Sequence, residues 1–152
     1  MAFVQKSAVA AGHQNPLTPG GPELVRARFG QPLAAADHEA GRVGVIGVLP
    51  AGTLPAHLYV RVPQALGAGF KASIGLANAA GTDFSADADD GGAAWVVEDT
   101  TGVAGGYVQV VPAAFTKVVP KDYDRKLLLK VVAPGTGTPA GLFAVDLVYG
   151  NA

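Results

Sequence analysis

The sequence predicts an all-β protein built as an antiparallel sandwich or barrel, and three observations lead to this fold class. Valine is abundant, with 20 residues against 13 Leu and 2 Ile, and β-branched side chains favour pleated strands. Glycine and proline supply 32 of the 152 residues, well above their ordinary share of roughly 12%, so turns are frequent. Several short segments also alternate apolar and polar residues with a period of two, which is typical of strands with one buried face.

Residues 1–22 stand apart from the rest and predict an extended N-terminal arm ahead of a β-sandwich domain at 23–152. The segment holds three prolines and a Gly-Gly pair, and it shows no sustained hydrophobic period, so we do not expect a packed element. Its apolar residues Phe3, Val4 and Leu17 would gain nothing from exposure on an isolated tail. A disordered terminus is the alternative.

Nine segments of the domain are predicted as strands. Four of them alternate strictly: 24–29, 57–62, 70–76 and 142–149. Residues 42–49 are apolar on both faces, so we expect an inner strand that is covered on both sides. The remaining four are 94–98, 107–111, 115–119 and 126–132. Residues 31–41 contain three consecutive alanines and are expected to form at most one short turn of helix.

Composition excludes several classes of function. The balance of 11 basic and 12 acidic residues, with a net charge of -1, argues against non-specific nucleic-acid binding. The sequence has no apolar run long enough for a membrane span, and its start does not resemble a signal peptide. Because Cys is absent, disulfides, thiolate metal sites and a Cys nucleophile are excluded.

The residues that could carry a metal or catalysis are scattered. His13, His38 and His57 form no close pair and are expected to be solvated or interfacial. The three serines lie outside any nucleophile elbow, so the sequence predicts no enzyme and no cofactor.

One acidic cluster comprises Asp83, Asp87, Asp89 and Asp90. Asp87, Asp89 and Glu98 fall at positions 1, 3 and 12 of an EF-hand-like calcium loop, but Gly91 at position 5 offers no side-chain ligand. A solvated acidic loop is the favoured interpretation.

A basic cluster comprises Lys117, Lys121, Arg125, Lys126 and Lys130. We interpret it as the charge protection of an edge strand, and a patch that docks on an acidic protein surface is the alternative.

Three stretches resemble small head proteins of tailed bacteriophages. Residues 42–62, RVGVIGVLPAGTLPAHLYVRV, run a strand through an LPAG turn into a second strand. Residues 64–76, QALGAGFKASIGL, and 140–149, AGLFAVDLVY, follow in the same order. The pattern is similar to capsid cement or decoration proteins, which implies a jelly-roll-like sandwich without catalytic residues. The long Pro-rich arm departs from that pattern.

The resemblance implies a structural virion protein on the outside of the capsid, made in the host cytoplasm, that binds and stabilises a major capsid shell. The implied partners are the major capsid protein and further copies of the chain in a dimer or trimer, with no nucleic acid and no membrane. We expect arm contacts at Phe3, Val4, Pro16 and Leu17, and domain-face contacts at Arg26, Arg28, Tyr59 and Arg61. Deletion of residues 1–22 should leave a folded domain that no longer binds shells.

The alternative function is a receptor- or carbohydrate-binding β-sandwich of a phage tail or spike. Such sites present exposed aromatic residues as stacking platforms. Here Trp95, Tyr107, Tyr123 and Tyr149 are few and scattered, and we expect most of them to be needed in the core.

Overall fold

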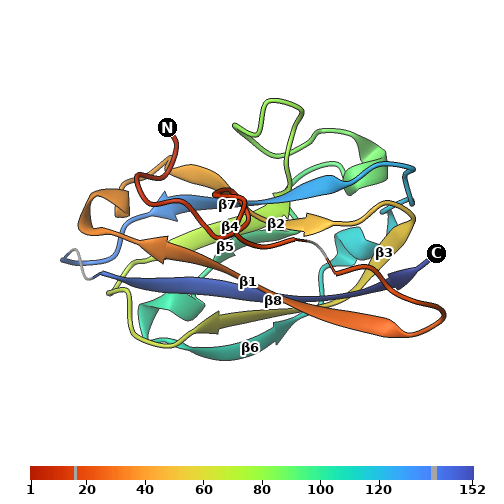
Figure 1. Ribbon diagram of the computed structural model, residues 1–152. Coiled ribbons are helices and arrows are strands. Elements are labelled where there is room, and N and C mark those ends of the chain that lie inside the picture. Colours follow the sequence, from red (N-terminus) through yellow and green to blue (C-terminus); the bar gives the residue numbers. More distant parts are fainter. Residues whose placement is uncertain (16, 138–139) are drawn as a thin grey trace.

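The computed structural model describes residues 1–15, 17–137 and 140–152, and these contain eight strands and four short 3-10 helices. The strands are β1 (Leu24–Leu33), β2 (Val43–Leu49), β3 (Thr53–Val62), β4 (Lys71–Leu76), β5 (Val96–Asp99), β6 (Gly106–Val110), β7 (Arg125–Ala133) and β8 (Gly141–Asn151). They form two four-stranded antiparallel sheets that face each other (Figure 1). The 3-10 helices are η1 (Ala35–Asp37), η2 (Ala88–Asp90), η3 (Thr101–Val103) and η4 (Ala113–Thr116).

The strand order is that of a jelly roll. One sheet has the order β1-β8-β3-β6 and the other has the order β2-β7-β4-β5. The pairs β1–β8, β2–β7, β3–β6 and β4–β5 are therefore nested inside one another along the chain, as in a folded ribbon wrapped around a core. The predicted all-β, jelly-roll-like sandwich is confirmed.

Eight of the nine predicted strands exist, with boundaries that differ by a few residues. The prediction of a strand at 115–119 is wrong. The 3-10 helix η4 begins after Pro112 and occupies the first part of this segment. Phe115 in that helix packs edge-on against Trp95, with ring centroids 4.9 Å apart, which explains its apolar character without a strand. The short helical turn expected within 31–41 is η1.

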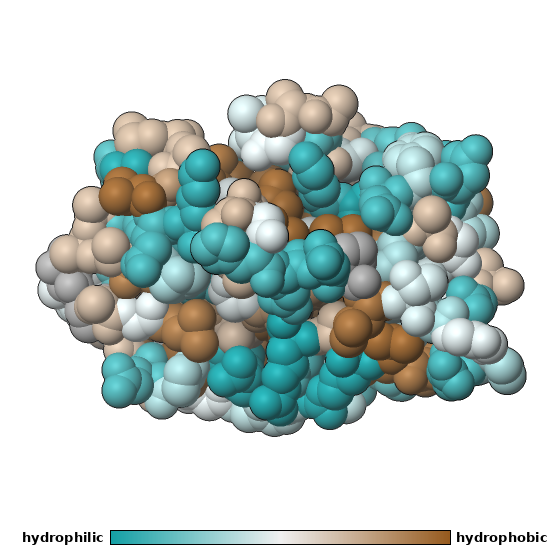
Figure 2. Space-filling model, in the orientation of Figure 1, coloured by the Kyte–Doolittle hydropathy of each residue, from teal (hydrophilic) through white to brown (hydrophobic). Residues whose placement is uncertain are grey.

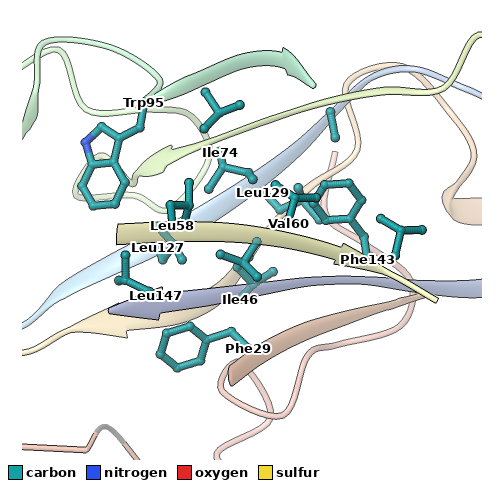
Figure 3. Packing of buried hydrophobic residues seen from close by; sticks show 14 of the residues in the cluster. Phe29, Ile46, Leu58, Val60, Ile74, Trp95, Leu127, Leu129, Phe143 and Leu147 are labelled. Carbon is teal, nitrogen blue, oxygen red and sulfur yellow. The ribbon is translucent and has the colours of Figure 1, made fainter. Parts of the chain in front are cut away.

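The hydrophobic core fills the space between the two sheets. Figure 3 shows Leu58, Val60 and Phe143 meeting Ile74 and Leu129 from the opposite sheet. Four of these side chains, all except Leu129, come from alternating positions that the sequence placed on one face, and all five are fully buried. Burial of each such side chain stabilises the fold by about 1.5–3 kcal/mol.

The N-terminal segment packs against the sandwich, in contrast to the unpacked arm that we expected. Figure 1 shows it running along the seam between β1 and the sheet that contains β2 and β7. Phe3 is only 7% exposed and belongs to the core cluster, where it fills the space above Gly44. Its backbone N–H donates to the carbonyl of Val43, and the N–H of Val43 donates to the carbonyl of Met1. The segment therefore forms a single parallel bridge to the edge of β2, between Ala2 and Val43.

The segment also corrects the prediction for residues 42–49. We expected an inner strand, but β2 is an edge strand whose free side is bridged by Ala2. Its second apolar face, at Val45 and Val48, lines a hollow with Val9 of the N-terminal segment. The apolar pattern on both faces thus reflects a cover supplied by the chain's own terminus.

No helix within the described residues is both long enough and apolar enough to cross a membrane.

Candidate functional site

Four residues predicted as domain-face contacts lie on one surface of the sandwich. Arg26 and Arg28 project outward from β1, while Ala27 and Phe29 between and after them enter the core. Antiparallel pairing sets Arg28 opposite Asp146 of β8, and Asp146 in turn opposite Tyr59 of β3. Because side chains two residues apart share a face, Arg61 joins the same surface.

Two further residues complete this surface, which we call the arginine–tyrosine face. It comprises Arg26, Arg28, Tyr59, Arg61, Tyr107 and Asp146, on the outer side of the β1-β8-β3-β6 sheet. Figure 2 shows hydrophilic side chains gathered over the region where β1 and β8 run.

Asp146 is the buried centre of this face. Its side chain is fully buried, and its Oδ2 accepts hydrogen bonds from Nε and Nη2 of Arg26 at 3.2 and 2.9 Å. Arg28 Nε lies 3.3 Å from the same oxygen, and the Tyr107 hydroxyl donates to it at 3.2 Å. Oδ1 is buried and finds no donor among the described residues. A buried carboxylate needs such cationic partners, so Asp146 fixes the two arginines in place.

The tyrosines hold the same arginine from a second direction. The rings of Tyr59 and Tyr107 stack with centroids 5.5 Å apart and planes inclined by 20°. The Arg26 guanidinium carbon lies 4.5 Å from the Tyr59 centroid and 5.7 Å from that of Tyr107. Guanidinium groups favour aromatic faces in this arrangement, so Arg26 is held by a carboxylate and two rings at once.

The face carries more positive than negative charge. The face holds three arginines and one aspartate, of which Arg26 and Arg28 pair with Asp146, and this leaves a local excess of two positive charges on a chain whose net charge is -1. Arg28 remains largely exposed while it pairs with Asp146. An exposed guanidinium on a preorganised surface is suited to carboxylate groups of a protein partner, because its donors match both carboxylate oxygens.

The predicted contacts of the N-terminal segment are not among the residues of the arginine–tyrosine face. Phe3 is buried in the core, so its ring is not available to a partner in this arrangement. Val4 and Leu17 are exposed, at 63% and 52%. The Tyr149 hydroxyl donates to the Leu17 carbonyl and holds that part of the segment against β8. Pro16 lies outside the described residues.

Three of the four residues of the acidic loop pair with residues of the basic cluster. Asp89 pairs with Lys121 at 2.6 Å, Asp90 with Arg125 at 2.9 Å, and Asp83 with Lys130 at 3.4 Å. The backbone N–H of Phe84, aided by the Lys130 ammonium, lowers the pKa of Asp83, and the hydrogen bond to Asp89 raises the pKa of Lys121. Within the described residues, no group of three His, Asp or Glu side chains could hold a metal ion.

The edge-strand interpretation of the basic cluster is wrong. Arg125, Lys126 and Lys130 belong to β7, which lies between β2 and β4 in the interior of its sheet. Because Arg125 and Lys130, together with Lys121 just before β7, pair with the acidic loop, these charges connect that loop to the sheet.

His38 also differs from its prediction as a solvated or interfacial residue. It is buried and meets the ring of Phe70 edge-on, with centroids 6.1 Å apart. His57 lies near Gln109 on the exposed part of the β3–β6 pair.

Two members of the arginine–tyrosine face, Tyr107 and Asp146, were not among the contacts predicted from the sequence. We expected most of the four scattered aromatic residues to be needed in the core, but Tyr107 is 48% exposed because it points outward from an edge strand. Asp146 was the one charge in an otherwise apolar strand, and that interruption was the available signal. Its arginine partner Arg26 lies 120 residues earlier, so only the fold could join them.

The fold is similar to that of chains in two solved phage capsids. A chain in the capsid of Ralstonia phage GP4 matches with a TM-score of 0.77 and 21% identity, over 99% of this chain and 98% of its own length. A chain in the capsid asymmetric unit of cyanophage Pam1 matches with a TM-score of 0.55 and 14% identity, over 90% of both chains. No family model and no curated protein matches the sequence. At these identities the likeness concerns the fold, which agrees with the sandwich that the sequence predicts.

Proposed function

We propose that this chain is a structural virion protein that binds the outside of a bacteriophage major capsid shell and stabilises it. It would thus act as a cement or decoration protein without enzymatic activity. The observation that carries the proposal is the similarity of nearly its whole length to a chain of a phage capsid. The sequence resemblance to cement proteins supports the same class of function.

The arginine–tyrosine face is the surface that we assign to the shell. Arg26 is fixed by Asp146 and by two tyrosine rings, so little side-chain entropy remains to be lost on binding. Arg and Tyr are the residue types that dominate protein interfaces, and the positive excess suits an acidic shell surface. Many identical sites on a closed shell would add avidity to a modest single contact.

The N-terminal segment offers a second contact area. The exposed side chains of Val4 and Leu17 stay candidates for shell contacts, as does Pro16. Phe3 would contribute indirectly, because its burial positions Val4 beside it. We no longer expect deletion of residues 1–22 to be a clean test, since it would also remove Phe3 from the core.

Arg28→Ser is a sharper test of the shell-binding face. Arg28 is exposed, and Arg26 and Tyr107 continue to satisfy Asp146 after the change, so the domain should stay folded. We expect binding to purified undecorated shells to weaken at least about tenfold, the effect of losing one interface arginine. The matched control is Lys117→Ser, which removes an exposed positive charge at the end of η4. Equal binding by both variants would contradict the assignment of this face.

A receptor- or carbohydrate-binding role on a tail or spike is the second candidate, and Tyr107 favours it. Its ring is half exposed and is held in place by stacking on Tyr59, so its exposed part could pack against the apolar face of a sugar ring. Glycan-array binding that is lost in Tyr107→Ala, together with no affinity for shells, would favour this role over the cement role.

A further inference from the structure

The two sheets have four edge strands, and one of them lacks the usual protection against pairing with another strand. The edges are β1 and β6 in one sheet and β2 and β5 in the other. Exposed edges present unpaired backbone groups, so proteins normally cover them, bend them or place charges on them.

Three of the edges carry such protection. The N-terminal segment bridges β2 at Val43, and β1 carries Arg26 and Arg28. The strand β5 is irregular, since its pairing with β4 shifts register and Glu98 adopts a positive φ of 52°. Glu98 also places a charge on that edge, paired with Lys71 at 3.6 Å.

The strand β6 differs on each of these points. It pairs with β3 over five consecutive residue pairs, from Val62–Gly106 to Leu58–Val110, so it is regular along its length. Residues 102–116 contain no charged residue, and the strand itself reads GYVQV. Val108 is 45% exposed, and the ribbon shows no other described strand beyond β6 (Figure 1).

We propose that β6 pairs antiparallel with β6 of a second copy of this chain, which joins two four-stranded sheets into one across a two-fold axis. With Val108 at the centre, Val108 faces its own counterpart. Tyr107 then lies opposite Gln109 of the second copy, and Gly106 lies opposite Val110 of the second copy. In this register the outward residues Tyr107 and Gln109 lie beside each other. Gly106, which has no side chain, leaves room for the branched side chain of Val110.

The absence of charge favours a second copy over a charged partner. A charge near the centre of a two-fold edge lies close to the same charge of the second copy, which destabilises pairing, and β6 has no such charge. A strand without charges also offers no complementarity to an acidic or basic surface. The pairing would place two arginine–tyrosine faces on the same side of the joined sheet. It does not depend on the proposed function, because it forms in solution.

Cysteine cross-linking tests the register directly, because the chain has no Cys of its own. Residues opposite each other in an antiparallel pair have Cα atoms about 4.5–5.5 Å apart, which lies within the range of a disulfide. We therefore expect Val108→Cys to form a covalent dimer on mild oxidation. Val97→Cys is the control, since Val97 is 69% exposed on the protected edge β5. Equal cross-linking of both variants, or none in Val108→Cys, would overturn the proposal.

The mass in solution is the second measurement. We expect sedimentation of the full chain to show a concentration-dependent dimer, and Val108→Lys to weaken it at least about tenfold through like-charge repulsion across the axis. Val97→Lys should dimerise like the parent chain. A parent chain that stays monomeric, a trimer, or a dimer unaffected by Val108→Lys would each overturn the proposal. Circular dichroism of each variant confirms that it is folded.

Discussion

The two long sides of this sandwich differ in how their edge strands are covered. On one side, β1 and β2 end their sheets, and residues 1–15 close the seam with a backbone bridge at Val43 and a core side chain, Phe3. On the other side, β5 and β6 end the same sheets with exposed valines at Val97 and Val108. The closed side uses the chain's own terminus to satisfy backbone groups and bury apolar area. The open side, formed by β5 and β6, leaves the outer backbone groups of its edge strands to solvent or to another molecule, and its valine side chains stay exposed.

The N-terminal segment is part of the folded unit, since it bridges β2 and buries Phe3 in the core. It lacks hydrophobic periodicity because it is neither a core strand nor a helix, yet it supplies the last contacts of the core. Stability should therefore respond strongly to changes on the closed side and weakly to equivalent changes on the open side.

Phe3→Ala should have the largest effect on stability. Truncation of a buried Phe typically costs about 3–5 kcal/mol, and we expect about 3 kcal/mol here because a terminal segment can relax. Denaturant titration measures the change. Val4→Ala beside it and Val97→Ala on the open side are controls that should each change the free energy of unfolding by less than about 0.5 kcal/mol. A similar loss in all three variants would remove the distinction between the two sides.

Ser7→Ala should have an intermediate effect. The buried Ser7 hydroxyl donates to the Val45 carbonyl at 2.6 Å and accepts from the N–H of Ala10 at 3.1 Å. Its removal leaves both groups without that partner, at a cost of about 1–3 kcal/mol. Thr116→Ala, which removes an exposed hydroxyl bonded to the Ala113 carbonyl, is the matched control. Thermal unfolding that ranks Thr116→Ala as the more damaging change would argue against a structural role for the N-terminal segment.

Tyr149 should give the smallest effect, visible as a dependence on pH. Burial raises the pKa of Tyr149, whose hydroxyl donates to the Leu17 carbonyl. As the pH rises, this phenol would ionise in the unfolded chain before it ionises in the folded one. The free energy of unfolding is therefore unaffected by the ionisation of Tyr149 below about pH 10 and decreases above it. Denaturation of the parent chain and of Tyr149→Phe between pH 8 and 11 measures this. The parent chain should lose more stability than Tyr149→Phe, and parallel curves would contradict the account.

The sequence predicted the sandwich well because strands with one buried face reveal themselves by a period of two, as in 24–29 and 142–149. It also placed Arg26, Arg28, Tyr59 and Arg61 on outward positions, because alternation alone decides which face a residue takes. Their meeting around Asp146 depended on the pairing of β1, β8 and β3, which no local pattern contains. The position of β7 inside its sheet, and hence the role of its basic residues, depended on strand order in the same way.

The proposed role as a structural component of a capsid surface can be tested by counting the chain in purified phage particles. Quantitative mass spectrometry gives its copy number relative to the most abundant shell protein. The account predicts a ratio of order one, and it predicts that particles stripped of the chain lose heat resistance. A few copies per particle would instead indicate a tail or spike, and complete absence from particles would contradict a structural role.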